Sequence, residues 1–183
     1  ATTKCAAEVV EAMLPWFSEY YGNPSSVYEL AGKSKEAVDE ARRQIASVIG
    51  AKENEIYFTA GGTEADNWAI KAAYEACKEK GNHIITSKVE HHAVLHTCQW
   101  LEKQGARVTY LDVERAITPE TILITIMAAN NEIGSVMPYK EIGMIAREHG
   151  ILFHTDAVQA FGQLPIDVEE CGIDMLSASA HKI

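Results

Sequence analysis

Apolar positions along this chain recur with two different periods, one typical of helices and one typical of strands. Helical spacing predicts five helices, at residues 6–21, 35–49, 63–80, 92–104 and 140–149. Short apolar or alternating runs predict six strands, at residues 55–59, 83–87, 107–111, 121–127, 151–155 and 173–179. Glycine at position 50 is expected to end the second helix.

This order of elements predicts a three-layer α/β/α fold. Strands that are separated by helices form a mostly parallel sheet, and the helices cover both of its faces. Ligands of such sheets bind beyond the carboxyl ends of the strands. Side chains that carry chemistry are therefore expected directly after the predicted strands.

Composition narrows the class of protein. With 183 residues, 47% hydrophobic and 23% charged, the chain has an ordinary globular composition. Its net charge of −10 argues against a nucleic-acid partner.

No apolar run approaches the roughly 18 residues of a membrane span, and no signal segment is visible, so we expect no membrane partner and a cytoplasmic location. Four scattered cysteines, Cys5, Cys77, Cys98 and Cys171, fit reduced thiols. From the abrupt start and end we expect a fragment of a longer protein.

A glycine turn at residues 59–67 lies between a predicted strand and a predicted helix. Gly62 would let the backbone turn tightly, and the first amides of the helix, together with the Thr63 hydroxyl, would suit a phosphate. The same residues also make a good turn and helix cap without any ligand.

Further candidates follow other predicted strands. Asp156 ends the strand at 151–155, where a buried carboxylate needs a partner such as a protonated pyridine nitrogen or an internal ion pair. Gln159 could reach the same ring or be a surface amide. His91 could stack on a cofactor or act in acid–base chemistry. Asn131 could bind a carboxylate or satisfy a turn.

The segment 177–182 places Lys182 at a strand end, with Ser179 and His181 beside it. Such a lysine suits a Schiff base with a phosphate-bearing aldehyde, although a surface lysine would have the same pattern. A pair of histidines four residues apart, His92 and His96, raises metal binding as an alternative. No third ligand at a useful spacing supports it, so no metal is expected. The other features converge on one cofactor, pyridoxal 5′-phosphate.

The chain resembles the cysteine desulfurases, which belong to the class V aminotransferase group of the fold-type I pyridoxal-phosphate enzymes. The resemblance covers the whole chain and rests on six ordered motifs, at residues 22–26 (GNPSS), 58–67 (FTAGGTEADN), 89–91 (VEH), 130–134 (NNEIG), 154–159 (HTDAVQ) and 177–182 (SASAHK). It implies that residues 1–183 form an N-terminal arm and the cofactor-binding large domain, which stops after the Schiff-base lysine and lacks the small C-terminal domain.

The resemblance also implies a role for each candidate residue. Lys182 would form the Schiff base and move the substrate proton, and His91 would stack on the ring. Asp156 would pair with the ring nitrogen and Gln159 would bond the ring oxygen. The phosphate would be held by Gly62, Thr63, Ser179 and His181. Asn131 would help to hold the substrate carboxylate or orient the ring.

The activity implied by the resemblance is conversion of L-cysteine to L-alanine, with the sulfur passed to an enzyme persulfide for iron–sulfur cluster assembly or another sulfur-using pathway. In this family the sulfur-accepting cysteine and a substrate-binding arginine follow the lysine, and none of the four cysteines of this chain matches that position. A homodimer and a sulfur-acceptor or scaffold protein are the implied partners. Alternatives are a selenocysteine lyase, a small-amino-acid aminotransferase, or a catalytically incomplete domain that only binds the cofactor.

Overall fold

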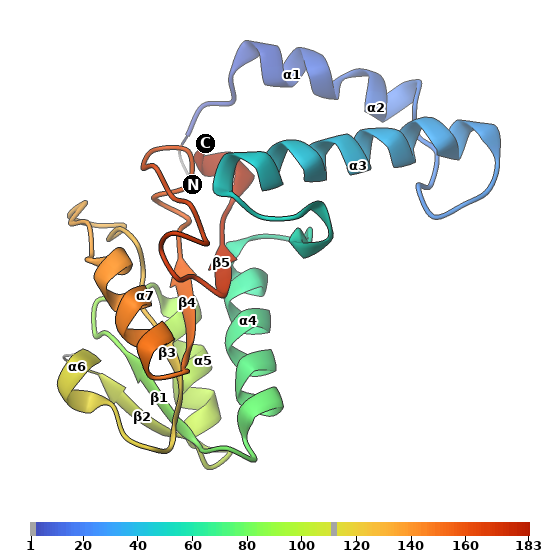
Figure 1. Ribbon diagram of the computed structural model, residues 1–183. Helices are drawn as coiled ribbons and strands as arrows, with labels where there is room; N and C mark the ends of the chain where they lie inside the picture. Colours follow the sequence, from blue (N-terminus) through green and yellow to red (C-terminus); the bar gives the residue numbers. More distant parts are fainter. Residues whose placement is uncertain (1–2, 111–112) are drawn as a thin grey trace. The chain divides into compact units, whose positions relative to one another are not determined.

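The computed structural model describes residues 3–110 and 113–183 (Figure 1). Contacts between residues divide the chain into two compact units, Ala1–Tyr57 and Phe58–Ile183, which we call the N-terminal and the C-terminal unit. The assignment of residues 1–183 to an arm and a large domain stays a prediction. No helix within the described part of the chain has both the length and the apolar character that crossing a membrane requires.

The N-terminal unit contains helices and no strand among its described residues. The predicted helix 6–21 is wrong as one element, because the structure has α1 (Ala7–Met13) and a separate short α2 (Pro15–Ser18). Pro15 has no amide hydrogen, and its ring clashes with the preceding helical turn. The helix α1 therefore ends shortly before it, at Met13. The long helix α3 (Glu29–Ile49) starts earlier than predicted and ends at Gly50, which has a positive φ of 71°.

The predicted strand 55–59 is also wrong. A 3-10 turn, η1 (Glu53–Glu55), starts this segment, and residues 56–60 do not join the sheet. The Lys52 amide donates to the Glu55 carboxylate at 2.9 Å, and the Ile56 amide donates to the Glu53 carbonyl at 3.3 Å. These local bonds use backbone groups that a strand would offer to a neighbouring strand, and they override the strand-like side chains.

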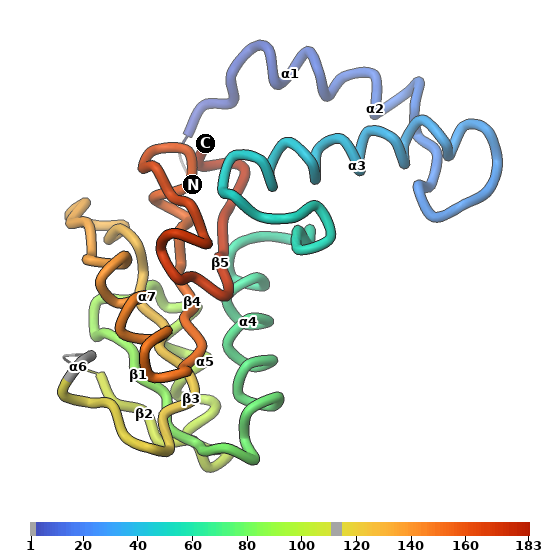
Figure 2. The backbone as a smooth tube through the Cα atoms, viewed as in Figure 1, coloured from blue at the N-terminus to red at the C-terminus, as the bar shows by residue number. Residues whose placement is uncertain are grey.

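The C-terminal unit contains a five-stranded parallel sheet in the order β2-β1-β3-β4-β5, which confirms the predicted mostly parallel sheet. The strands, seen side by side in Figure 2, are β1 (His83–Thr86), β2 (Arg107–Tyr110), β3 (Thr121–Thr125), β4 (Leu152–Asp156) and β5 (Met175–Ser177). Leu111, the last residue predicted for the second of these strands, lies outside the described residues. All strands point the same way, so their carboxyl ends share one edge of the sheet.

Helices cover both faces of this sheet, as predicted for a three-layer fold. On one face α4 (Gly62–Cys77) and α5 (His92–Glu102) pack on side chains that include Ile84 and Leu123. On the other face α7 (Tyr139–Glu148) packs on side chains that include Ile85 and Ile124. Successive strand residues therefore enter different cores, as the two-residue period of a strand requires. A short helix, α6 (Val113–Ala116), follows β2.

Candidate functional site

The start of α4 and the end of β5 meet at the predicted phosphate site. The Gly62 amide donates a hydrogen bond to the Ser179 hydroxyl oxygen at 3.1 Å, and both residues are buried. A Cβ atom at Gly62 would lie 2.8 Å from Val158 Cγ2 and 3.2 Å from Ser179 Oγ, so a larger residue would have to displace these side chains. Thr63, the next residue, is exposed in the first turn of the helix.

Asp156 is the last residue of β4 and is 4% exposed. Its Oδ1 accepts the Val158 amide hydrogen at 2.9 Å. Burial raises the pKa of this carboxyl, while the Val158 hydrogen bond and the charge of His91 act in the opposite direction. A cation placed beside Asp156 would compensate the cost of burying its charge.

Three ionisable groups meet beside this strand end. The nearest ligand atoms of Asp66, His91 and Asp156 all lie within 4.8 Å of one another. Asp66 projects from α4 and is 1% exposed. Burial is the main cause that raises its pKa to about 8, and the nearby Asp156 carboxyl raises it further. Two carboxyls and an imidazole this close together, here called the cation site, favour a cationic guest such as a protonated ring nitrogen.

His91 is held at the N-cap of α5. Its Nδ1 accepts the Ala93 amide hydrogen at 3.2 Å, which fixes the ring orientation and assigns the N–H of the neutral ring to Nε2. The ring is exposed and belongs to the cation site defined above. His92 and His96, the pair considered for a metal, are exposed and stack with ring centroids 5.2 Å apart. They do not belong to the group around Asp156.

Glu90, which sequence reasoning missed, supports the loop that carries His91. Its carboxylate accepts the Met127 amide hydrogen at 2.9 and 3.1 Å and the Ser87 hydroxyl at 2.5 Å, joining the ends of β1 and β3. It is 5% exposed, and burial raises its pKa to about 7. Asp66 was missed as well. One available signal was its position in the helical period with the buried Ile70 of α4, an unusual place for a carboxyl.

The remaining predicted residues lie at the same edge but make different contributions. Asn131 is exposed, whereas its neighbour Asn130 organises the loop: Asn130 Oδ1 accepts the amides of Glu132 and Ile133 at 2.9 and 3.0 Å. Asn130 Nδ2 also donates to the Val89 carbonyl at 3.0 Å. The asparagine that satisfies the turn is therefore Asn130, and the role of Asn131 stays a prediction.

Lys182 lies in a short 3-10 turn, η2 (Ala180–Lys182), directly after β5. It is half-buried, and its amide donates to the Ser179 carbonyl at 3.0 Å. His181 is exposed in the same turn, and Gln159 is half-buried in the turn that follows Asp156. The structure thus brings Gly62 against Ser179 and His91 toward Asp156, and it places the other predicted residues on adjoining loops.

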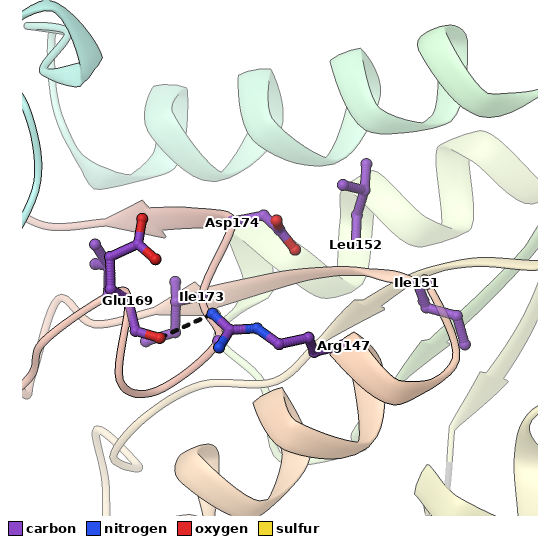
Figure 3. A pocket seen from close by; sticks show the side chains of 9 residues that line it. Arg147, Ile151, Leu152, Glu169, Ile173 and Asp174 are labelled. Atoms are coloured by element: carbon purple, nitrogen blue, oxygen red, sulfur yellow. Dashed lines mark hydrogen bonds between the residues drawn. The ribbon is translucent and has the colours of Figure 1, made fainter.

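A separate recess of about 350 Å³ lies at the opposite edge of the sheet (Figure 3). Its lining includes Leu152 at the start of β4 and Asp174 before β5. There Arg147 donates to the Glu169 carbonyl at 2.8 Å, and the Asp174 carboxylate accepts the Phe153 amide at 2.8 Å. These contacts are structural, and the strand starts are not where ligands of parallel sheets bind.

The family model for class-V aminotransferases matches residues 1–183. The chain belongs to the class-V aminotransferase family. The chain is 58% identical to a cysteine desulfurase IscS of Methanosarcina thermophila and 55% identical to one of Clostridium botulinum, with all of this chain and 48% and 49% of those proteins covered. A solved structure described as SspA in complex with cysteine matches with a TM-score of 0.95 and 46% identity, over 99% of this chain and 55% of that one.

These similarities confirm the resemblance to cysteine desulfurases and the fold predicted from it. The chain spans about half the length of the curated relatives it matches. Membership of the class-V aminotransferase family implies pyridoxal 5′-phosphate as the cofactor.

Proposed function

We propose that this class-V aminotransferase family member is a pyridoxal-phosphate-dependent cysteine desulfurase, which converts L-cysteine to L-alanine and passes the sulfur to a protein persulfide. The observation that carries the proposal is the group of Asp66, His91 and Asp156 at the strand ends, in a chain 58% identical to a cysteine desulfurase. The cysteine-bound structure of a 46% identical protein supports L-cysteine as the substrate.

The residues present fit this cofactor. Buried Asp66 Oδ1 has no hydrogen-bond partner among the described residues, and Asp156 is a buried acid at a strand end, so the site calls for a cationic guest. The Gly62 amide and the Ser179 hydroxyl lie together at the first turn of α4, and amide and hydroxyl groups at a helix start are the kind that bind a phosphate. When bound, pyridoxal phosphate supplies an aldehyde carbon and an electron-accepting ring.

Each predicted residue has a defined task in this proposal. Asp156 would hold the negative charge that faces the ring nitrogen, and His91 would cover the ring and orient it. Gln159 would hydrogen-bond the ring oxygen. Asn131 would bind the substrate carboxylate or orient the ring, and the phosphate would be held by Gly62, Thr63, Ser179 and His181.

Lys182 would carry the covalent attachment and the proton transfer. Its Nζ would bind the aldehyde carbon, and after cysteine displaces it, the free amine can take the α-proton, because it is released next to that carbon. A protein thiolate then attacks the cysteine sulfur. An S–S bond would form as the Cβ–S bond breaks, Cβ would take up one proton, and Cα would recover the proton held by Lys182 to give alanine.

The sulfur-accepting thiol is not one of the buried cysteines of this chain. Cys98 is fully buried, and burial raises its pKa to about 12, so little thiolate forms near neutral pH. Cys171 is equally buried. We propose that a cysteine outside these 183 residues accepts the sulfur. We also propose that the protein acts as a homodimer in the cytoplasm. A sulfur-acceptor or scaffold protein would then receive the sulfur for iron–sulfur cluster assembly or another sulfur-using pathway.

The decisive experiment supplies the intact protein and pyridoxal phosphate with L-cysteine and measures alanine and sulfide together. Equal amounts of both products are expected in the presence of a thiol reductant, because each turnover releases one alanine and one sulfur atom. Alanine from L-selenocysteine alone would show a selenocysteine lyase, and keto-acid formation without sulfide would show an aminotransferase. Cofactor binding without any product would show a binding domain.

A further inference from the structure

Asp66 and Asp156 form a pair of buried carboxyl groups at the strand ends of the C-terminal unit. Their exposed fractions are 1% and 4%, and their nearest ligand atoms lie within 4.8 Å of each other. Two ionised carboxylates at such a distance repel each other strongly when water is excluded. One member of the pair is therefore expected to keep its proton.

Hydrogen bonds distinguish the two members of the pair. Asp156 Oδ1 accepts the Val158 amide hydrogen at 2.9 Å, which favours its charged form. Asp66 Oδ1 has no hydrogen-bond partner within the described ranges, and His154 Nε2 lies 3.7 Å from it. A buried carboxylate oxygen without a donor is costly, so the pattern favours a neutral Asp66.

The other groups that face Asp66 supply little positive charge. His154 is fully buried between the Thr125 hydroxyl at 2.8 Å and the Ser177 hydroxyl at 3.0 Å, and burial lowers its pKa to about 4. The nearby Glu90 carboxyl raises the pKa of Asp66 further, and the Ser177 hydroxyl acts in the opposite direction. His91, the remaining imidazole, lies on the exposed side of the pair.

We infer that Asp66 is a positioning residue of the cofactor site, which holds a proton beside Asp156 and thereby leaves Asp156 as the single negative charge facing the ring nitrogen. The inference rests on the proposed function, because the charge being matched is that of the pyridine ring. One buried cation pairs with one carboxylate, and a second charge there would stay uncompensated.

The test compares the intact wild-type protein with Asp66→Asn, which keeps the side-chain shape but cannot titrate. The dissociation constant of pyridoxal phosphate is measured for both from about pH 6 to about pH 10, and their ratio is taken, so that titrations common to both proteins cancel. The matched control is Asp174→Asn, the same chemical change at the opposite edge of the sheet. Wild-type protein without cofactor is also titrated by infrared spectroscopy for a protonated buried carboxyl.

Near pH 6 the two dissociation constants should agree within about threefold, because both residues are then neutral. Toward pH 10 the affinity of the wild type should rise at least about fivefold relative to Asp66→Asn, because the cofactor-free wild type then holds two repelling carboxylates and the cationic ring relieves that repulsion. An infrared component that disappears with a midpoint near pH 8 should be present in the wild type and absent from Asp66→Asn. A separate component with a midpoint near pH 7, from the buried Glu90 carboxyl, should remain in both proteins. Asp174→Asn should match the wild type throughout.

A ratio that does not change with pH overturns the inference, and so does a large loss of affinity for Asp66→Asn at pH 6. If Asp66→Asn does not fold, the infrared titration of the wild type decides, because a missing component with a midpoint near pH 8 overturns the inference without any variant. Wild-type protein that fails to bind pyridoxal phosphate at all would refute the proposed function, and the infrared result would still report on Asp66 separately.

Discussion

The Gly62 amide and the Ser179 hydroxyl, 3.1 Å apart, join the first turn of α4 to the loop after β5. The two residues are 117 positions apart in the sequence, near the two ends of the C-terminal unit. A phosphate site made from both segments therefore exists only when the whole parallel sheet between them is formed.

Substitution of Gly62 by alanine should weaken cofactor binding. The new Cβ would lie 2.8 Å from Val158 Cγ2, and overpacking of this kind costs about 1–3 kcal/mol, so we expect the dissociation constant of pyridoxal phosphate to rise about tenfold. Absorbance titration of the intact protein measures it. The control is Gly61→Ala, whose Cβ meets nothing within 4 Å.

A second variant separates crowding from other causes at this position. Adding Val158→Ala to Gly62→Ala removes the atom that the new methyl group would strike, so much of the lost affinity should return. If the double variant binds no better than Gly62→Ala, crowding against Val158 is not the reason for the loss.

Replacement of Lys182 by alanine should abolish the covalent attachment of the cofactor. Reduction with borohydride should fix pyridoxal phosphate on Lys182 of the intact protein, as peptide mass spectrometry would show, and Lys182→Ala should yield no such adduct. Lys103→Ala, a change on a lysine at the end of α5, should label normally. Labelling of Lys182→Ala to the wild-type extent would exclude Lys182 from this role.

Asp156→Asn should damage catalysis far more than folding. The amide keeps the shape and can still accept the Val158 amide hydrogen, but it removes the charge. Hydrogen bonds to charged groups contribute about 1.5–3 kcal/mol, so we expect kcat to fall roughly 10- to 100-fold while the free energy of unfolding changes by less than about 1 kcal/mol. Steady-state kinetics and denaturant titration measure the two quantities. Wild-type kcat in this variant would show that no ring-nitrogen pairing operates.

Gly143 and Gly32 should respond to alanine in opposite directions. A Cβ at Gly143 on α7 would overlap the Cys171 carbonyl oxygen, so backbone must move, and we expect a loss of about 1–3 kcal/mol in unfolding free energy. A Cβ at Gly32 within α3 meets nothing within 4 Å, and alanine there should add about 0.5–1 kcal/mol through helix propensity. Denaturant unfolding of the intact protein measures both, and equal responses would contradict the packing described for α7.

The buried Glu90 predicts how stability depends on pH in the cofactor-free protein. Its pKa is raised from 4.5 to about 7, so the folded state keeps a proton that the unfolded state releases. The contribution to stability is complete below about pH 4.5 and is lost as pH rises to about 7, with a slope of at most about 1.4 kcal/mol per pH unit. Glu90→Gln should flatten this slope, and the exposed Glu120→Gln should not. A steeper slope in Glu90→Gln would reverse the assignment.

The sequence predicted the parallel sheet well because its buried strands are short, apolar and separated by helices. The rule that ligands bind at strand ends predicted Asp156, now the last residue of β4, and Lys182, in the turn after β5, and their roles stay predictions. Asp66 and Glu90 could not be identified in this way, because their importance arises from carboxyls and amides contributed by distant parts of the chain. The strand predicted at residues 55–59 was wrong because of a local effect. Hydrogen bonds of the turn at Glu55 outweighed the strand-like side chains of this segment.

Neighbouring Ile84 and Ile85 enter separate cores on the two faces of the sheet. Side chains that share no neighbours contribute almost independently to stability. Side chains of the core beneath α7 can therefore be substituted, in evolution or in a redesign for heat resistance, without changing the core that packs against α4 and its glycine turn.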